Sequence, residues 1–131
     1  MHMATEGDMH PLQTLIARHR QGIACGVTSI CSAHPLVVEA GMRHAARHDD
    51  AILLFEATCN QVNQFGGYTG MQPADFVDYV HAIADDVQFP YEDIILGGDH
   101  LGPSGWQNEP EMVAMAKAED LIRRYIEARF Q

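Results

Sequence analysis

An aspartate and a histidine stand side by side at positions 99 and 100, directly after an apolar run that ends in two glycines. The run Ile94-Ile95-Leu96 is typical of a buried strand, and Gly97-Gly98 lets the backbone open beside a pocket. Parallel α/β proteins place their chemistry at the carboxyl ends of strands. There, His100 can bind a metal ion while Asp99 moves a proton. The competing interpretation is that the pair only caps a strand-to-helix turn.

Polar residues also follow the two earlier apolar runs. Glu56 ends the second run, where its carboxylate can orient substrate hydroxyls, support a metal ligand or form an ion pair with a neighbouring strand. Ser32 follows the first run and is a candidate for the same pocket. The amides of Asn60, Asn63 and Gln64 suit a polyhydroxylated ligand, although asparagine in a loop often bonds to its own backbone. We predict that these five residues bind substrate.

Three apolar runs, each followed by a loop and a helical pattern opening at a proline, organise the chain. The runs span 22–30, 52–56 and 94–98, and the prolines are Pro35, Pro73 and Pro110. Proline suits the first helical position because the N–H it lacks would have no intrahelical partner there. A further helix over 11–20 precedes the first run. We therefore predict one helix followed by three β-α units.

Apolar residues recur at helical spacing in these helices, which predicts the faces that pack against a sheet. The sets are Leu12, Leu15 and Ile16 in the first helix, Phe76, Val80, Ile83 and Val87 after Pro73, and Met112, Met115, Ile122 and Ile126 after Pro110. The first set is expected to be buried, and the second forms the clearest single face.

Short apolar strands that alternate with helices are typical of a parallel sheet covered by helices. The turn at 31–35 lacks a Gly-x-Gly-x-x-Gly sequence, which removes most support for a dinucleotide-binding fold. A (β/α)8 barrel needs roughly 250 residues, and this chain has 131. We predict an α/β fold over 9–131, an N-terminal helix and the first three βα units of a TIM-type barrel, incomplete because it ends before a fourth strand. Residues 1–8 are expected to be a disordered extension.

Three parallel strands would leave two unpaired edges and an uncovered barrel-facing surface. We therefore expect the chain to associate with a partner or with itself. A net charge of −10 repels phosphate backbones and anionic lipids, so neither a nucleic acid nor a membrane is an expected partner. The three cysteines are odd in number and no two have C-x-x-C spacing. This pattern, with no secretory signal, favours the reducing cytoplasm.

Several segments can be matched to a known family. They are Ser32-Ala33-His34-Pro35-Leu36, Glu56-Ala57-Thr58 with the adjoining stretch 60–71, and the stretch 96–103. Together they resemble the class II D-tagatose-1,6-bisphosphate aldolase subunit that is usually described as non-catalytic, and they are similar to metal-dependent ketohexose epimerases. The sequence Asn-Gln-Val-Asn-Gln-Phe-Gly-Gly-Tyr-Thr-Gly at 60–70 is the most specific part. The resemblance covers 11–131, and family members are longer and complete the barrel.

The resemblance implies aldol-type chemistry on a sugar phosphate with a divalent metal, for which we expect zinc. It implies that His100 is a metal ligand and that Asp99 is the acid/base. The remaining ligands come from later strands in such barrels, and zinc sites use about three protein ligands or more. The chain alone is therefore expected to be inactive, and a catalytic aldolase subunit is its expected partner.

Three functions stay open. The chain is a subunit, or the N-terminal part of one, that supports a class II tagatose-bisphosphate aldolase in carbohydrate catabolism such as galactitol breakdown. Alternatively, it is a metal-dependent sugar epimerase or aldolase that is active once the barrel is complete. The third possibility is a truncated, non-enzymatic product stabilised by oligomerisation.

Overall fold

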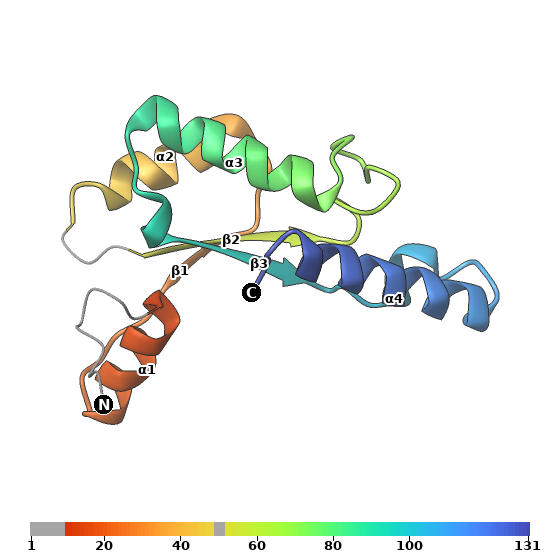
Figure 1. The fold of residues 1–131 in the computed structure, drawn as a ribbon, viewed down its shortest axis with the longest axis horizontal. Coiled ribbons are helices and arrows are strands. Elements are labelled where there is room, and N and C mark those ends of the chain that lie inside the picture. The colour runs from red at the N-terminus through yellow and green to blue at the C-terminus, as the bar shows by residue number, and fades with distance from the viewer. Residues whose placement is uncertain (1–9, 49–51) are drawn as a thin grey trace.

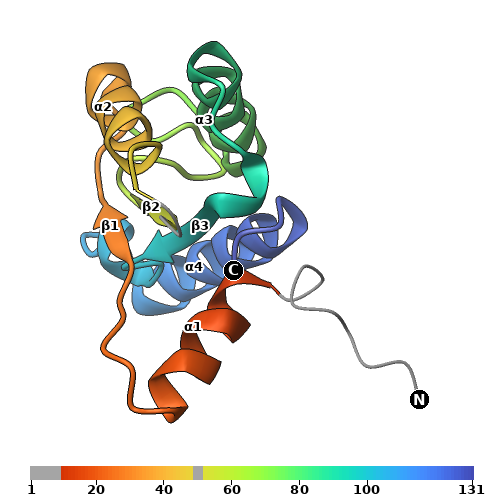
Figure 2. The ribbon, with the colours of Figure 1, turned by 90° about the vertical axis from the view of Figure 1, so that its left-hand side faces the viewer.

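The computed structural model describes residues 10–48 and 52–131. Along the chain, the elements are α1 (Pro11–Arg20), β1 (Thr28–Ile30), α2 (Pro35–Ala45), β2 (Leu53–Thr58), α3 (Pro73–Val87), η2 (Tyr91–Asp93), β3 (Ile94–Asp99), η3 (Pro103–Trp106) and α4 (Glu111–Glu127). The three strands form one parallel sheet in the order β1-β2-β3. Helices α2 and α3 lie over one face of this sheet, and α1 lies on its other side (Figures 1 and 2). This arrangement confirms the predicted α/β fold with an N-terminal helix and three βα units.

The register of the sheet places residues of neighbouring strands in rows. Glu56 of β2 lies opposite Gly97 of β3, and Thr58 lies opposite Asp99. Side chains alternate between the two faces of a strand. Along β2, buried and half-buried residues alternate, with 53, 55 and 57 buried. The buried set faces α2 and α3, so the other set, which includes Glu56, faces the side that would be the interior of a barrel.

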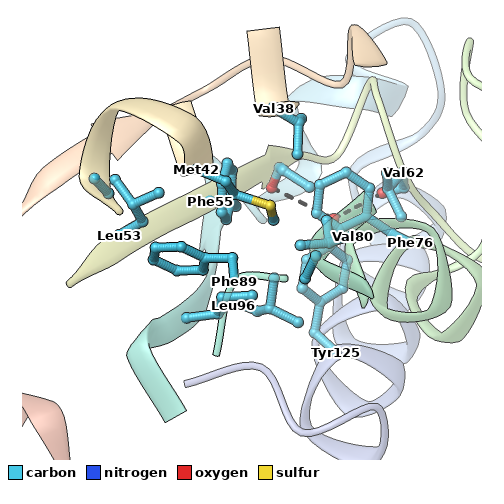
Figure 3. Packing of buried hydrophobic residues seen from close by; sticks show 14 of the residues in the cluster. Val38, Met42, Leu53, Phe55, Val62, Phe76, Val80, Phe89, Leu96 and Tyr125 are labelled. Carbon is cyan, nitrogen blue, oxygen red and sulfur yellow. Dashed lines mark hydrogen bonds between the residues drawn. The ribbon is translucent and has the colours of Figure 1, made fainter. Parts of the chain in front are cut away.

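The hydrophobic core lies between the sheet and the helices (Figure 3). Its largest fully buried side chains come from α2, β2, the loop after β2, α3 and α4: Val38, Met42, Phe55, Cys59, Val62, Phe76, Val80, Leu121 and Tyr125. The predicted face of α3 is confirmed, because Phe76 and Val80 are buried and Ile83 and Val87 pack against the core. Burying such side chains stabilises a fold by roughly 1.5–3 kcal/mol each.

The strands differ from their predicted ranges. The first strand covers 28–30 and not 22–30. Its neighbour β2 begins at Leu53, which pairs with Thr28, so the residues before 28 have no described strand beside them. The second and third strands extend further than predicted, to Thr58 and Asp99. Asp99 is therefore the last residue of a strand and does not follow it.

Two predicted helix faces are wrong. Helix α1 has the predicted bounds but buries none of its residues, because it lies away from α2 and α3. Helix α4 begins at Glu111, with Pro110 as its N-cap. Its buried residues are Ala114, Ala118, Leu121 and Tyr125, whereas the four predicted ones are exposed. Within 10–48 and 52–131, no helix is long and apolar enough to cross a membrane. The predicted extension 1–8 lies outside the described residues.

Candidate functional site at the carboxyl ends of the strands

Four polar side chains lie on the barrel-facing side of the sheet, at or near the carboxyl ends of the strands: Ser29, Cys31, Glu56 and Asp99. Asp99 shares this face because it pairs with Thr58, two residues after Glu56. Parallel strands end at the same edge of a sheet, so the register alone brings these groups from three strands together. Glu56 and Asp99 were predicted for this site from the sequence.

Glu56 is held by two donors from the β1 segment. Its Oε2 accepts a hydrogen bond from Ser29 Oγ at 2.5 Å and another from Cys31 Sγ at 2.9 Å. Hydrogen bonds to a carboxylate favour its charged form, so Cys31 and then Ser29 lower the pKa of Glu56. The same contact with Glu56 is the main cause that raises the pKa of the Cys31 thiol. Glu56 is therefore an ionised acceptor, and Cys31 is a protonated donor.

Gly97 provides the space that Glu56 occupies. A Cβ at Gly97 would lie 2.9 Å from Leu54 Cδ1 and 3.3 Å from Glu56 Cγ. Leu54 and Glu56 are the inward neighbours of this position on β2. A side chain at position 97 would therefore move Leu54 or the carboxylate of Glu56.

The side chains of Asp99 and His100 lie close together and are accessible to solvent. His100 Nε2 lies 3.5 Å from Asp99 Oδ1, and the two side chains are 78% and 36% exposed, respectively. His100 has a φ of +52°, in the left-handed region that residues with a Cβ rarely adopt. Its imidazole lines a pocket of about 470 Å³ between η3 and the start of α4, together with Ser104 and Glu109.

The donor types at this pair suit a zinc site, but the described residues do not complete one. Within 10–48 and 52–131, no three His, Cys, Asp or Glu side chains lie close enough together to hold a metal ion. A zinc site needs about three protein ligands or more. His100 and its neighbouring carboxylate would therefore be a part of such a site.

Ser32 lies beside this cluster but serves the start of α2. Its Oγ accepts a hydrogen bond from the backbone N–H of His34, and His34 Nδ1 accepts one from the N–H of Leu36. Ser32 also lines a second pocket, of about 510 Å³, next to Cys31. The hydroxyl thus has a structural partner at the edge of a space that a ligand could enter.

The loop after β2 uses most of its predicted substrate-binding amides internally. Buried Asn63 donates to the carbonyl of Cys59 and accepts from the N–H groups of Phe65 and Gly67. Gly67, at a φ of +54°, approaches the loop backbone so closely that a Cβ would lie 2.3 Å from Gln61 O. These contacts give the loop a fixed shape.

Gln64 and Asn60, the other two amides, differ in exposure. Buried Gln64 donates to the carbonyl of Lys117 on α4, and its Oε1 has no hydrogen-bond partner. Asn60 is exposed at the rim, and its side chain makes no hydrogen bond with the described residues. Of the three amides, that of Asn60 alone is free to meet a ligand. The predicted binding roles of Asn63 and Gln64 gain no support from these contacts.

A parallel sheet with helices over one face and polar groups at the carboxyl ends of its strands defines a segment of a (β/α)-barrel protein. A model of the D-tagatose-1,6-bisphosphate aldolase subunit GatZ/KbaZ-like family matches residues 12–131, and the chain belongs to that family.

Relatives and a solved structure agree with this assignment. The chain is 58% identical over 119 residues to the D-tagatose-1,6-bisphosphate aldolase subunit GatZ of Klebsiella pneumoniae, covering 91% of this chain and 28% of that protein. The chain is 56% identical over 119 residues to the D-tagatose-1,6-bisphosphate aldolase subunit GatZ of Salmonella typhimurium, covering 91% of this chain and 28% of that protein. The crystal structure of a probable tagatose 6 phosphate kinase from Sinorhizobium meliloti matches with a TM-score of 0.78 and 60% identity, covering 82% of this chain and 27% of that one. The chain thus spans about 28% of the length of these curated relatives.

Proposed function

We propose that the chain contributes the first three βα units to a barrel that supports class II cleavage of a ketohexose bisphosphate. The family places the chain among tagatose-bisphosphate aldolase subunits. The observation that carries the proposal is the position of Asp99, last in β3 on the barrel-facing side, with His100 next to it and Glu56 one strand away. The work of such a subunit would be sugar catabolism, such as galactitol breakdown in the cytoplasm, beside a catalytic aldolase subunit.

Aldol cleavage breaks the bond between the carbon next to the carbonyl group and the following carbon, which carries a hydroxyl group and becomes the new carbonyl carbon. A base removes the proton of the hydroxyl group, and the electron pair of the broken bond moves to the carbonyl side as an enediolate. Asp99 is the group proposed to accept and return the proton. Asp99 is half-buried at the strand end, so its carboxylate has access to a ligand on the barrel-facing side.

A divalent metal, for which zinc is proposed, would stabilise the negative oxygen of the enediolate when it is bound. His100 is the proposed ligand from this chain, and the later strands of a complete barrel would provide the others. Because no three metal-ligating side chains of the described residues lie close together, the chain alone is expected to have little affinity for zinc and no turnover.

A chimera tests the roles of the two residues. The chain is joined to the residues that follow the matched segment in the Klebsiella pneumoniae relative, and cleavage of D-tagatose 1,6-bisphosphate is measured with and without a catalytic aldolase subunit. Asp99→Asn should abolish the contribution of the chimera to turnover while its zinc content stays the same. His100→Ala should lower both. Acid/base groups contribute about 10²–10⁴-fold to a rate.

Asp78→Asn is the matched control, because Asp78 is an exposed carboxylate on α3, far along the chain from the strand ends. It should leave turnover and zinc content unchanged. Full turnover in Asp99→Asn would remove Asp99 from the proton transfer. Epimerisation of the sugar without cleavage would instead favour the second candidate function, which uses the same proton transfer.

A further inference from the structure

The contacts around Glu56 divide its two oxygen atoms between different surroundings. Oε2 receives both hydrogen bonds, from Ser29 Oγ and Cys31 Sγ. No described residue donates to Oε1, which lies 3.8 Å from the position that a Cβ at Gly97 would take. The carboxylate is thus fixed through one oxygen, and the other oxygen stays open on the barrel-facing side.

The donors to Glu56 are neutral, which matters for what the free oxygen can do. An arginine or lysine partner would neutralise the carboxylate, whereas a hydroxyl and a thiol orient it and leave its negative charge in place. An ionised carboxylate with a free lone pair is a strong acceptor for a hydroxyl proton. It repels a phosphate group, however, so the matching ligand atom is a hydroxyl group of a sugar and not its phosphate.

We infer that Ser29 and Cys31 are positioning residues that hold Glu56 so that its Oε1 accepts a hydrogen bond from a hydroxyl group of a polyhydroxylated ligand. The inference rests on the proposed function for the class of ligand. Gly97 belongs to the same arrangement, because any larger residue would push against Glu56 or Leu54. Of these three residues, Gly97 was expected beside a pocket from the sequence, whereas Ser29 was not predicted for the site.

A purely structural role is the alternative, because the same hydrogen bonds also join the short edge strand β1 to β2. The two roles differ in their chemistry at Cys31. If Glu56 holds the thiol as a donor, removing its charge must change the pH at which the thiol ionises. If the cluster only braces the strand, the loss must loosen the region at every pH.

Alkylation of Cys31 by iodoacetamide separates these roles in the chain as it is. The rate is followed against pH by mass spectrometry of the labelled peptide, with the buried Cys59 as an internal reference. Only the thiolate reacts, so Glu56→Gln should raise the rate at Cys31 several-fold at mildly alkaline pH and shift its pH curve to lower pH. Glu39→Gln, which changes an exposed carboxylate paired with Arg43 on α2, should leave the curve unchanged.

An unshifted curve in Glu56→Gln would overturn the positioning role. A rate that rises equally at every pH, at both Cys31 and Cys59, would show bracing and would also overturn it. Ser29→Ala provides a second test, because Cys31 then remains as the hydrogen-bond donor to Glu56. The pH curve of Cys31 should then move without loss of the folded state, as checked by circular dichroism.

Protection by ligand tests the other half of the inference. D-tagatose and D-tagatose 1,6-bisphosphate at high concentration should each slow alkylation of Cys31 in the wild-type chain, and inorganic phosphate should not. Glu56→Gln should lose this protection. Protection by phosphate alone, or no protection by either sugar, would overturn the role of Oε1. These outcomes are independent of the turnover of Asp99 variants, so either proposal can fail without the other.

Discussion

Asp99 and His100 are neighbours in the chain, but their backbones are held differently. Asp99 ends a strand that pairs with β2 along its whole length, whereas His100 has a positive φ of 52°. Such a conformation costs a non-glycine residue on the order of 1–3 kcal/mol. A glycine would be easier to accommodate at position 100, but it has no side chain to bind a metal ion. The strained histidine is therefore consistent with the metal-binding role that the family resemblance implies for it.

This strain makes a prediction for His100→Gly. Glycine adopts a positive φ freely, and this gain is partly offset by the larger freedom of glycine in the unfolded chain. We expect the free energy of unfolding to rise by roughly 0.5–1 kcal/mol in urea titrations, while the proposed metal binding of the completed barrel is lost.

Gln88→Gly is the control for His100→Gly. Gln88 has a φ of 59° at the end of α3 and precedes β3, at whose other end the candidate site lies. It should give a similar gain in stability without any effect on metal content. A loss of stability in His100→Gly would show that the contact with Asp99, and not the backbone, dominates at this residue.

The residues of the site were predictable to different degrees. Asp99 and Glu56 stand at the ends of strongly apolar strands, so their place could be inferred from the order of residue types. Ser29 and Cys31 lie in the shortest strand and just after it, where too few residues show which ones face inward. The internal bonds of Asn63 depend on how its loop closes, which residue types alone do not determine.

At the scale of elements, α4 shows why large apolar residues are an unreliable guide to a buried face. The residues that contact the core include Ala114 and Ala118, which are small enough to let the helix lie close to its neighbours. The pattern of Met112 and Ile126 is as regular but points outward. In α3, Phe76 and Val80 are buried and Ile83 and Val87 pack against the core, so the same reasoning was correct there.

Tyr125 connects α4 to the carboxyl end of β2. Its hydroxyl is buried and donates to the carbonyl of Val62 at 3.0 Å and lies 3.4 Å from that of Ala57 (Figure 3). Burial raises the pKa of this phenol far above its ordinary value, so it is a donor at every physiological pH. The contact joins the helix to the loop that carries the most specific stretch of the family.

Removal of this hydroxyl should have a measurable cost. Tyr125→Phe leaves the Val62 carbonyl without its buried donor, and we expect a loss of about 1–3 kcal/mol in the free energy of unfolding. The exposed Tyr68 provides the control: Tyr68→Phe should change stability by less than about 0.5 kcal/mol. Equal effects of the two substitutions in urea titrations would show that the hydrogen bonds of Tyr125 do not hold α4 in place.

For the whole molecule, the outward face of α4 presents a row of exposed apolar side chains. Met112 and Ile126 are 80% and 67% exposed, and Met115 and Ile122 lie on the same side of the helix. Large contiguous apolar surfaces on a soluble chain are typically covered by another protein surface. The chain matches about 28% of its curated relatives, and longer relatives have further residues to cover such a face.

We therefore expect the chain alone to self-associate through this face. Light scattering after gel filtration should show a dimer or larger species, and the double substitution Ile122→Glu and Ile126→Glu should shift it toward the monomer. Leu36→Glu is the control, because Leu36 is as exposed as Ile126 but lies on α2. A wild-type chain that stays monomeric at all concentrations would contradict the role assigned to α4.

The loop at 60–71 has a consequence for how this family can vary. Its shape is maintained from within, by Asn63, by Thr69 bonded to the Gln61 carbonyl, and by the close approach of Gly67. Asn60 and Tyr68 are exposed, and their side chains take no part in that bracing, whereas the Phe65 ring packs edge-on against Trp106. Selection can therefore exchange the exposed residues for new specificities while the frame beneath them is inherited intact.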